Sequence, residues 1–281
     1  MLDQLKNVRE VLGKPYYEAD DVLLYQGDCQ EILKNLDGES LDLVVTSPPY
    51  NIGKEYESPL ELVDYVSWCS SWMTQLFPLV RQEGSFWLNL GYVPIEGKGK
   101  AVPLPYLLWD KSPFFMIQEV VWNYGAGVAA RRSFSPRNEK LLWFVKDQAS
   151  YYFDLDSVRD PDVKYPNQKK NGVLKCNPLG KNPSDVWHIK KVTSGAGRAS
   201  SERTPHPAQF PEEMVDRVIR SCSKPSGLVL DPFMGSGSTA VAARKAGRPC
   251  IGIELKAEYL DLAVQRLERP LPQEFPIFDK V

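Results

Sequence analysis

The segment Leu228-Val-Leu-Asp-Pro-Phe-Met-Gly-Ser-Gly-Ser-Thr-Ala240 predicts the central unit of an α/β fold. Its apolar start is typical of a buried strand, which we expect to end at Asp231, and the glycines that follow indicate a tight turn. Ser238 or Thr239 can cap the helix that we expect next. This order of strand, turn and helix makes a candidate binding loop, because glycines let backbone amides approach a ligand closely.

The glycine spacing alone does not decide which ligand the loop binds. Residues 235–240 fit the pattern G-x-G-x-x-G/A of dinucleotide sites. A further strand, predicted over Cys250–Glu254, ends in a carboxylate near the spacing of about 20 residues at which an acid binds ribose hydroxyls. Adenosine cofactors of several classes share that ribose, so an NAD-binding Rossmann oxidoreductase remains an alternative at this point.

In a second motif, Leu41-Asp-Leu-Val-Val-Thr-Ser-Pro-Pro-Tyr50, the residues Leu41–Thr46 predict a buried strand, and Ser-Pro-Pro-Tyr follows it. Two successive prolines hold an extended backbone at the carboxyl end of that strand, which is where ligands bind in open α/β sheets. The Ser47 hydroxyl and the Pro48 carbonyl can both accept from one exocyclic amine, and Tyr50 offers a flat face to a planar ring. Taken alone, the four residues also fit a proline-rich turn.

Together, the two motifs resemble those of the β-class of DNA amino-methyltransferases, in which the catalytic motif precedes the cofactor loop. The resemblance covers about residues 22–266. It implies an α/β fold with a doubly wound mixed sheet, the Rossmann-like methyltransferase fold in circularly permuted order, with a small DNA-recognition insert. It also implies five parts, namely an N-terminal extension (1–20), a catalytic half (21–158), a target-recognition region (159–203), a cofactor-binding half (204–268) and a tail (269–281).

The resemblance assigns catalysis to the motif Ser47, Pro48, Pro49 and Tyr50, and it implies S-adenosyl-L-methionine as the cofactor. In the family, the acid that corresponds to Asp231 faces the cationic methionine end of the cofactor, and the one that corresponds to Asp28 contacts its adenine. The residues expected to bind the cofactor are Asp28, Thr46, His206, Pro207, Phe210, Asp231, Phe233, Gly235, Ser236, Gly237, Ser238, Thr239 and Glu254. Two further segments, 84–90 and 137–146, resemble the strand beside the catalytic one and the strands that help to line the target-base pocket.

Residues 159–203 form a locally basic segment in a chain of net charge −2. The segment carries ten Lys and Arg against four Asp and Glu, and it is rich in Asn, Gly, Pro and Ser. It occupies the family's position for target recognition and carries the charge that phosphate contact requires, although a solvated loop is the alternative. The residues expected to bind DNA are Lys164, Lys169, Lys170, Lys175, Lys181, Lys190, Lys191, Arg198 and Arg203. Trp187 is expected to be buried.

The composition fits a globular protein with a full core. Apolar residues make up 43% of the chain, and no apolar run approaches the roughly 18 residues of a membrane span. Five scattered cysteines suggest neither a metal site nor a disulfide framework. We therefore expect no signal peptide, no membrane partner, and the cytoplasm of a prokaryote or of a phage host.

The expected reaction is methyl transfer to an exocyclic amine of a base flipped out of double-stranded DNA. Ser47 favours the N4 amine of cytosine, since Ser-Pro-Pro-Tyr is typical of the family's cytosine-N4 enzymes, with adenine N6 as the alternative. We expect a restriction–modification role, a possible cognate endonuclease, and a monomer or homodimer. A DNA-binding module without catalysis and a methyltransferase for a protein amide are further alternatives, which the intact motifs and the basic segment disfavour.

Overall fold

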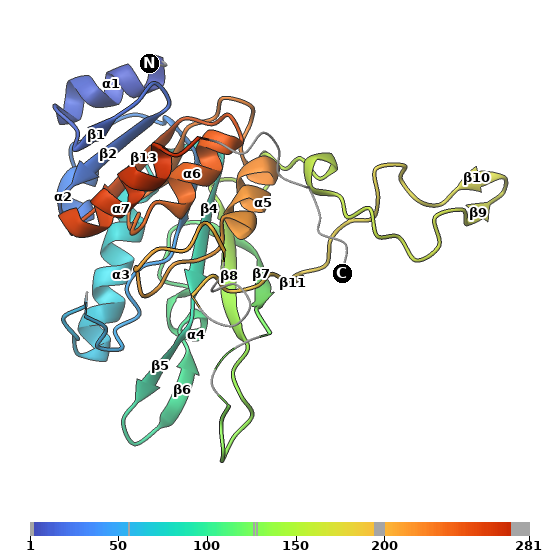
Figure 1. Cartoon of the computed structure of the whole chain (residues 1–281), viewed down its shortest axis with the longest axis horizontal. Helices are drawn as coiled ribbons and strands as arrows, with labels where there is room; N and C mark the ends of the chain where they lie inside the picture. The colour runs from blue at the N-terminus through green and yellow to red at the C-terminus, as the bar shows by residue number, and fades with distance from the viewer. Residues whose placement is uncertain (1–2, 56, 126, 128, 194–199, 271–281) are drawn as a thin grey trace.

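The structure, a computed structural model, describes residues 3–55, 57–125, 127, 129–193 and 200–270. Within these residues a nine-stranded mixed sheet runs through the molecule, in the order β1-β2-β13-β12-β3-β4-β8-β7-β11 (Figure 1). Its strands are β1 (Tyr17–Glu18), β2 (Val22–Gln26), β3 (Leu41–Thr46), β4 (Val80–Leu90), β7 (Phe115–Asn123), β8 (Asn138–Val145), β11 (Val186–His188), β12 (Val229–Asp231) and β13 (Cys250–Glu254).

The centre of the sheet is parallel. β2, β13, β12, β3 and β4 run side by side in one direction, whereas β8 is antiparallel to both β4 and β7. This pattern confirms the mixed α/β sheet predicted from the sequence. β12 and β13 lie between β2 and β3, so the predicted cofactor-binding and catalytic halves share one sheet. Both motif strands therefore end at the same edge of the sheet.

Helices cover both faces of the sheet because neighbouring residues on each strand point to opposite sides. Val45 and Trp87 join the core that packs under α5 and α6, whereas Val44 and Phe86 join the core under α3. The helices are α1 (Asp3–Leu12), α2 (Cys29–Leu33), α3 (Leu62–Leu76), α4 (Pro105–Leu108), α5 (Glu212–Cys222), α6 (Ser238–Lys245) and α7 (Ala257–Leu267), with a short 3-10 turn η1 (Asp156–Val158).

The predicted N-terminal extension belongs to this fold. β1 pairs with β2, and Leu5 and Val8 of α1 are buried against the core. None of the described helices is both long enough and apolar enough to span a membrane. The predicted tail lies outside the described residues from position 271 onward.

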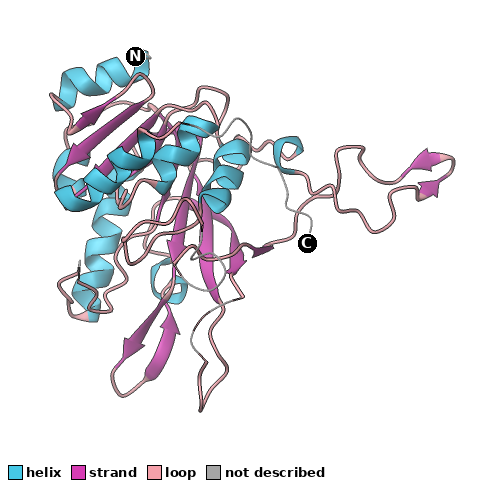
Figure 2. Cartoon of the chain, in the orientation of Figure 1, coloured by secondary structure: helices cyan, strands magenta, loops and turns pink. Residues whose placement is uncertain are grey.

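Residues 159–185 form an arm that extends away from the body of the molecule (Figure 1). Figure 2 shows that the arm is almost entirely loop, apart from the hairpin of β9 (Lys169–Lys170) and β10 (Val173–Leu174). The arm closes at its base, where Asp160 and Lys181 exchange two backbone hydrogen bonds of 3.0 and 2.9 Å. Beyond it, Trp187 of β11 is buried as predicted, and its ring stacks on that of Trp87.

A second hairpin, β5 (Tyr92–Ile95) and β6 (Gly99–Pro103), projects from the end of β4. In Figure 1 it points to the same side of the molecule as the loop between β7 and β8. Both projections leave the body near the edge at which the motif strands end.

Candidate active site

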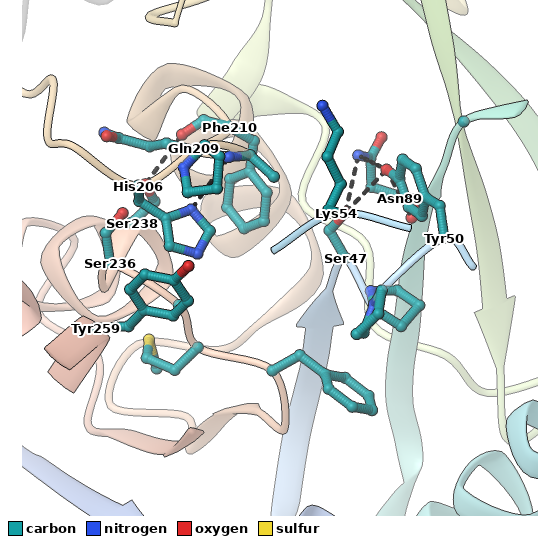
Figure 3. A pocket seen from close by; sticks show the side chains of 18 of the residues that line it. Ser47, Tyr50, Lys54, Asn89, His206, Gln209, Phe210, Ser236, Ser238 and Tyr259 are labelled. Carbon is teal, nitrogen blue, oxygen red and sulfur yellow. Dashed lines mark hydrogen bonds between the residues drawn. The ribbon is translucent and has the colours of Figure 1, made fainter. Parts of the chain in front are cut away.

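One cavity of about 430 Å³ lies at the carboxyl ends of β3, β12 and β13. Residues from both sequence motifs line it, as the position of ligand sites in α/β sheets predicts. In Figure 3, Ser47, Tyr50 and Asn89 lie on one side, and His206, Phe210, Ser236 and Tyr259 lie on the other. The volume is within the usual range for a cofactor or small-molecule site, roughly 300 to 1,000 Å³.

The Ser-Pro-Pro-Tyr motif is held by hydrogen bonds on the catalytic side of this cavity. The prolines end the β3 ladder, since they lack an N–H group. Ser47 Oγ and Tyr50 Oη lie 2.9 Å apart, and Asn89 Nδ2 donates to both oxygens, at 3.3 and 2.8 Å. Tyr65 Oη donates to the Pro49 carbonyl at 2.8 Å. The geometry fixes a hydroxyl oxygen and a rigid backbone turn at the cavity wall.

Two further residues complete this side of the cavity, and the sequence did not single them out as site residues. Glu139 Oε2 accepts from Asn89 Nδ2 at 3.0 Å and from Tyr50 Oη at 3.1 Å. Asn89 is 3% exposed within the apolar strand β4. A polar residue in such a strand is costly unless it is paired, and this cost is the signal that marks Asn89 for attention.

Lys191 lies in this cavity, away from the exposed arm lysines with which it was grouped as a DNA-binding residue. Its Nζ lies 2.8 Å from Glu139 Oε1 and 3.9 Å from the centre of the Tyr124 ring. Burial by itself lowers the pKa of Lys191, but the Glu139 carboxylate more than offsets this effect and the pKa lies above its ordinary value. Trp122 and Tyr124 add aromatic surface to the same wall.

The expected DNA-binding residues other than Lys191 are exposed where the structure describes them. They are Lys164, Lys169, Lys170, Lys175, Lys181, Lys190 and Arg203. Lys181 forms an ion pair with Asp160 at the base of the arm. Arg198 lies outside the described residues.

The cofactor side of the cavity receives nine of the residues expected there. These residues are Asp28, His206, Pro207, Phe210, Phe233, Gly235, Ser236, Ser238 and Glu254. Glu254 Oε2 accepts from the Gly235 N–H at 2.8 Å, so the acid that ends β13 also shapes the loop. Burial raises the pKa of Glu254 above its ordinary value.

The remaining four, Thr46, Asp231, Gly237 and Thr239, are not among the residues that line the cavity. The Asp231 side chain is fully buried, and Oδ1 accepts from Thr46 Oγ1 and from the Phe233 N–H, at 2.6 and 3.0 Å. Oδ2 accepts from Thr239 Oγ1 at 2.6 Å. The carboxylate therefore joins β12 to β3 and to α6 behind the loop, and it does not face the cavity.

Substitution of Asp231 by Asn should change the pH dependence of stability. Burial raises the pKa of Asp231 from 3.8 to about 6, so the folded state binds this proton more tightly than the unfolded state. The stability associated with protonated Asp231 is full below the unfolded pKa and is lost as pH rises through the folded pKa. The wild-type protein should therefore lose about 3 kcal/mol of its free energy of unfolding between about pH 4 and 6. The Asp231→Asn variant, which has no proton to lose at this position, should not show that decrease.

Urea unfolding of both proteins across that range measures the effect as the difference between their free energies of unfolding. An amide keeps the shape of the side chain and one acceptor oxygen, so the fold should persist. A difference that stays constant with pH would contradict the prediction.

The loop around Gly235 has the shape of a cradle for a ligand. Gly235 has a φ of +52°, and a Cβ at this position would lie 3.0 Å from His206 Nε2. Burial lowers the pKa of His206 to about 4, so its imidazole is neutral near pH 7 and places no positive charge here. The ring lies edge-on to Tyr259, with centroids 4.3 Å apart. A neutral, partly aromatic wall in the same cavity as the Glu254 carboxylate fits a cationic adenosine cofactor.

Helix α3 contacts both sides of the site. Tyr65 holds the Pro49 carbonyl, as described above, whereas Trp68 and Trp72 pack edge-on against Phe233 of the cofactor loop. The ring centroids lie 5.6 and 5.2 Å apart. One helix thus contacts both motifs.

Similar proteins place this site in a known class. The cavity combines a Rossmann-like sheet, the glycine-rich loop around Gly235 and the Ser-Pro-Pro-Tyr motif. This combination is the arrangement of an S-adenosylmethionine-dependent methyltransferase. The chain belongs to the DNA methylase family, whose model (N6_N4_Mtase) matches residues 41–265. The cofactor is S-adenosyl-L-methionine, which is present in solved structures of the same fold such as the M1.HpyAVI–SAM complex (TM-score 0.59, 24% identity).

Two relatives and one solved structure show the extent of the similarity. The chain is 65% identical over 265 residues to the Type II methyltransferase M.ScaI of Streptomyces caespitosus, covering 94% of this chain and 87% of the relative. It is 36% identical to M.BglII of Bacillus subtilis, and the alignment covers 87% of this chain and 68% of that relative. PvuII DNA methyltransferase (cytosine-N4-specific) has the same fold, with a TM-score of 0.73 and 23% identity. The match covers 95% of this chain and 92% of the PvuII enzyme. These matches confirm the predicted Rossmann-like methyltransferase fold.

Proposed function

We propose that the chain is a site-specific Type II DNA methyltransferase of a restriction–modification system, and that it methylates the N4 amine of cytosine. The observation that carries the proposal is the Ser47 hydroxyl, held by Tyr50 and Asn89 in the cavity that also contains the cofactor loop. Its relatives M.ScaI and M.BglII are Type II methyltransferases, which supports the restriction–modification role. A cognate endonuclease would then be a partner.

The residues of the catalytic side act on a base that has left the duplex stack. Ser47 Oγ and the Pro48 carbonyl accept the two hydrogens of the amine, which directs the nitrogen lone pair toward the cofactor side. Tyr124 and Trp122 provide aromatic surface for the ring, and the Tyr50 ring is fixed by its hydroxyl contacts. When bound, S-adenosylmethionine supplies a methyl group on a positively charged sulfur. The protein's contribution is mainly positioning and electrostatics.

The cofactor side supplies groups for each part of the cofactor. Glu254 would accept from the ribose hydroxyls, and Asp28, which caps α2, would contact the adenine. The loop from Gly235 to Ser238, with His206 and Phe210, would enclose the methionine end. Asp231 has no direct contact in this proposal, because its carboxylate is used behind the loop.

Cytosine N4 is favoured over adenine N6 by Ser47, through the family pattern. The matched family includes both N6 and N4 enzymes, so adenine N6 remains the second candidate. We also propose that the fold is circularly permuted, since the catalytic motif at residue 47 precedes the loop at residue 235 in the chain. The arm, with its exposed lysines, is proposed to contact the DNA backbone and to carry target recognition.

The product nucleoside tests the proposal. Incubation with labelled S-adenosylmethionine and mixed-sequence duplex DNA, followed by digestion to nucleosides and mass spectrometry, should give N4-methylcytosine. N6-methyladenine would overturn the choice of base and retain the class of enzyme. Absence of any methylated nucleoside, in spite of cofactor binding and of DNA that contains all short recognition sites, would overturn the choice of DNA as substrate.

A further inference from the structure

A row of three hydrogen-bonding side chains leads away from the proposed amine position. Ser47 Oγ lies 2.9 Å from Tyr50 Oη, and Tyr50 Oη lies 3.1 Å from Glu139 Oε2. All three residues line the cavity. The row begins at the oxygen that would contact the amine and ends at a carboxylate.

The donors in this row can be assigned. Tyr50 has one hydroxyl proton, and the Glu139 carboxylate is an acceptor only, so the 3.1 Å contact between them is a donation by Tyr50. The proton between Ser47 and Tyr50 must then belong to Ser47. This arrangement leaves the lone pairs of Ser47 Oγ as acceptors for the substrate, with Asn89 Nδ2 as a longer donor at 3.3 Å.

Asn89 holds the row in place but cannot take a proton from it. Its Nδ2 lies within 3.3 Å of oxygens on all three residues, and an amide is not a base near neutral pH. Its Oδ1 is buried and has no hydrogen-bond partner among the described residues. The side chain of Asn89 therefore acts in this row through its amide nitrogen alone.

The charge on Glu139 is balanced within the protein. Lys191 Nζ lies 2.8 Å from Oε1, and the side chains of Glu139 and Lys191 are only 14% and 22% exposed. The other titratable groups that face Glu139 are tyrosines, namely Tyr50 after β3, Tyr92 on β5 and Tyr124 after β7. Glu139 thus accepts from the hydroxyl at the end of the row, and its second oxygen is fixed by an ammonium group.

We propose that Ser47, Tyr50 and Glu139 form a proton relay that removes the proton released by the amine; this inference rests on the proposed function. The amine nitrogen forms the new N–C bond with its lone pair as the methyl–sulfur bond breaks, and it then carries one proton too many. That proton passes to Ser47 Oγ while Ser47 gives its own to Tyr50, and Tyr50 gives its own to Glu139. Serine and tyrosine end as neutral hydroxyls, and Glu139 ends as a carboxylic acid.

The proton needs a route through the protein because a flipped base fills the cavity and separates its amine from bulk water. Glu139 returns the proton to solvent after the methylated base has left. The Lys191 ammonium, 2.8 Å from Oε1, keeps the carboxyl group in the same position for the next cycle.

Two variants test the relay at different points. Glu139→Gln keeps the shape and one acceptor oxygen but cannot take a proton, and Tyr50→Phe keeps the ring but removes the central hydroxyl. Glu10→Gln, on the exposed face of α1, is the matched control. The rate of a single methyl transfer is measured with saturating DNA and cofactor across about pH 5 to 9, in water and in deuterium oxide.

Both variants should slow the transfer by about 10²-fold, the usual contribution of one proton-transfer group. The rise of the rate with pH on the acidic side, and the solvent isotope effect, should disappear in both. The control should retain the rate and both properties. DNA and cofactor affinities should remain within about twofold, which separates the relay from a loss of binding.

A Glu139→Gln variant with the pH profile and isotope effect of the wild type overturns the relay. If that variant does not fold, the Tyr50→Phe variant decides in the same way. A wild-type product of N6-methyladenine overturns the choice of cytosine alone, since the relay requires only an exocyclic amine. The two failures are distinguishable, because one is seen in the identity of the methylated base and the other in the ratio of variant to wild-type rates.

Discussion

Replacement of Ser47 by Ala should lower the turnover number by about 10² to 10³, the usual cost of removing one group that stabilises developing charge. Ser47 Oγ is the proposed acceptor of an amine hydrogen, and it also anchors the contacts to Tyr50 and Asn89. The hydroxyl has no contact with the residues of the cofactor side among the hydrogen bonds described above. Cofactor affinity should therefore change by less than about threefold.

Turnover with labelled cofactor and the dissociation constant from calorimetry measure the two effects separately. Ser67→Ala is the matched control, because Ser67 lies on the exposed side of α3. Unchanged turnover in Ser47→Ala would remove the proposed role of this hydroxyl. An equal loss of cofactor affinity and of turnover would assign it to cofactor binding instead.

Neutralisation of the arm should weaken DNA binding and reduce its salt dependence. Lys169, Lys170 and Lys175 are exposed on or beside the β9–β10 hairpin. Each phosphate contact that is lost should make the slope of log K against log salt shallower by about 0.9, so the triple Gln variant should change it by up to about 3. The affinity for target DNA should fall by about 10²-fold at moderate ionic strength.

A second triple variant separates the arm from the total charge of the protein. Lys6, Lys14 and Lys34 are exposed near α1 and α2, on the body of the molecule, and their conversion to Gln changes the net charge equally. Fluorescence anisotropy at several salt concentrations should show the large change only for the arm variant. Equal changes in both would mean that the lysines act through the overall field of the protein.

The sequence predicted the fold well where local patterns were strong. β3 and β13 have the predicted bounds Leu41–Thr46 and Cys250–Glu254, because each is a short apolar run that ends at polar or proline residues. The carboxyl-edge rule then brought both motifs to one cavity, although they are almost 190 residues apart in the chain. That prediction required only the positions at which two parallel strands end.

The interior of the site was less accessible to sequence reasoning. The pattern around Asp231 places an acid beside the loop, but it does not reveal which way the carboxylate points, and Thr46 and Thr239 turn it inward. The pair of Lys191 and Glu139 joins residues 52 positions apart on different elements. Such a contact depends on how the strands are arranged, so Lys191 had the same sequence signature as the exposed arm lysines.

Helix α3 links the two halves of the site, and measurements of cofactor or DNA affinity would not detect this link. Its Tyr65 fixes the turn that would hold the methyl acceptor, and its Trp68 and Trp72 support the loop that would hold the methyl donor. A single helix therefore contacts the supports of both the donor and the acceptor, in addition to the direct pairing of β3 with β12. Substitutions along this helix can leave both substrates bound at full affinity and still slow the transfer, because they change the distance that the methyl group must cross.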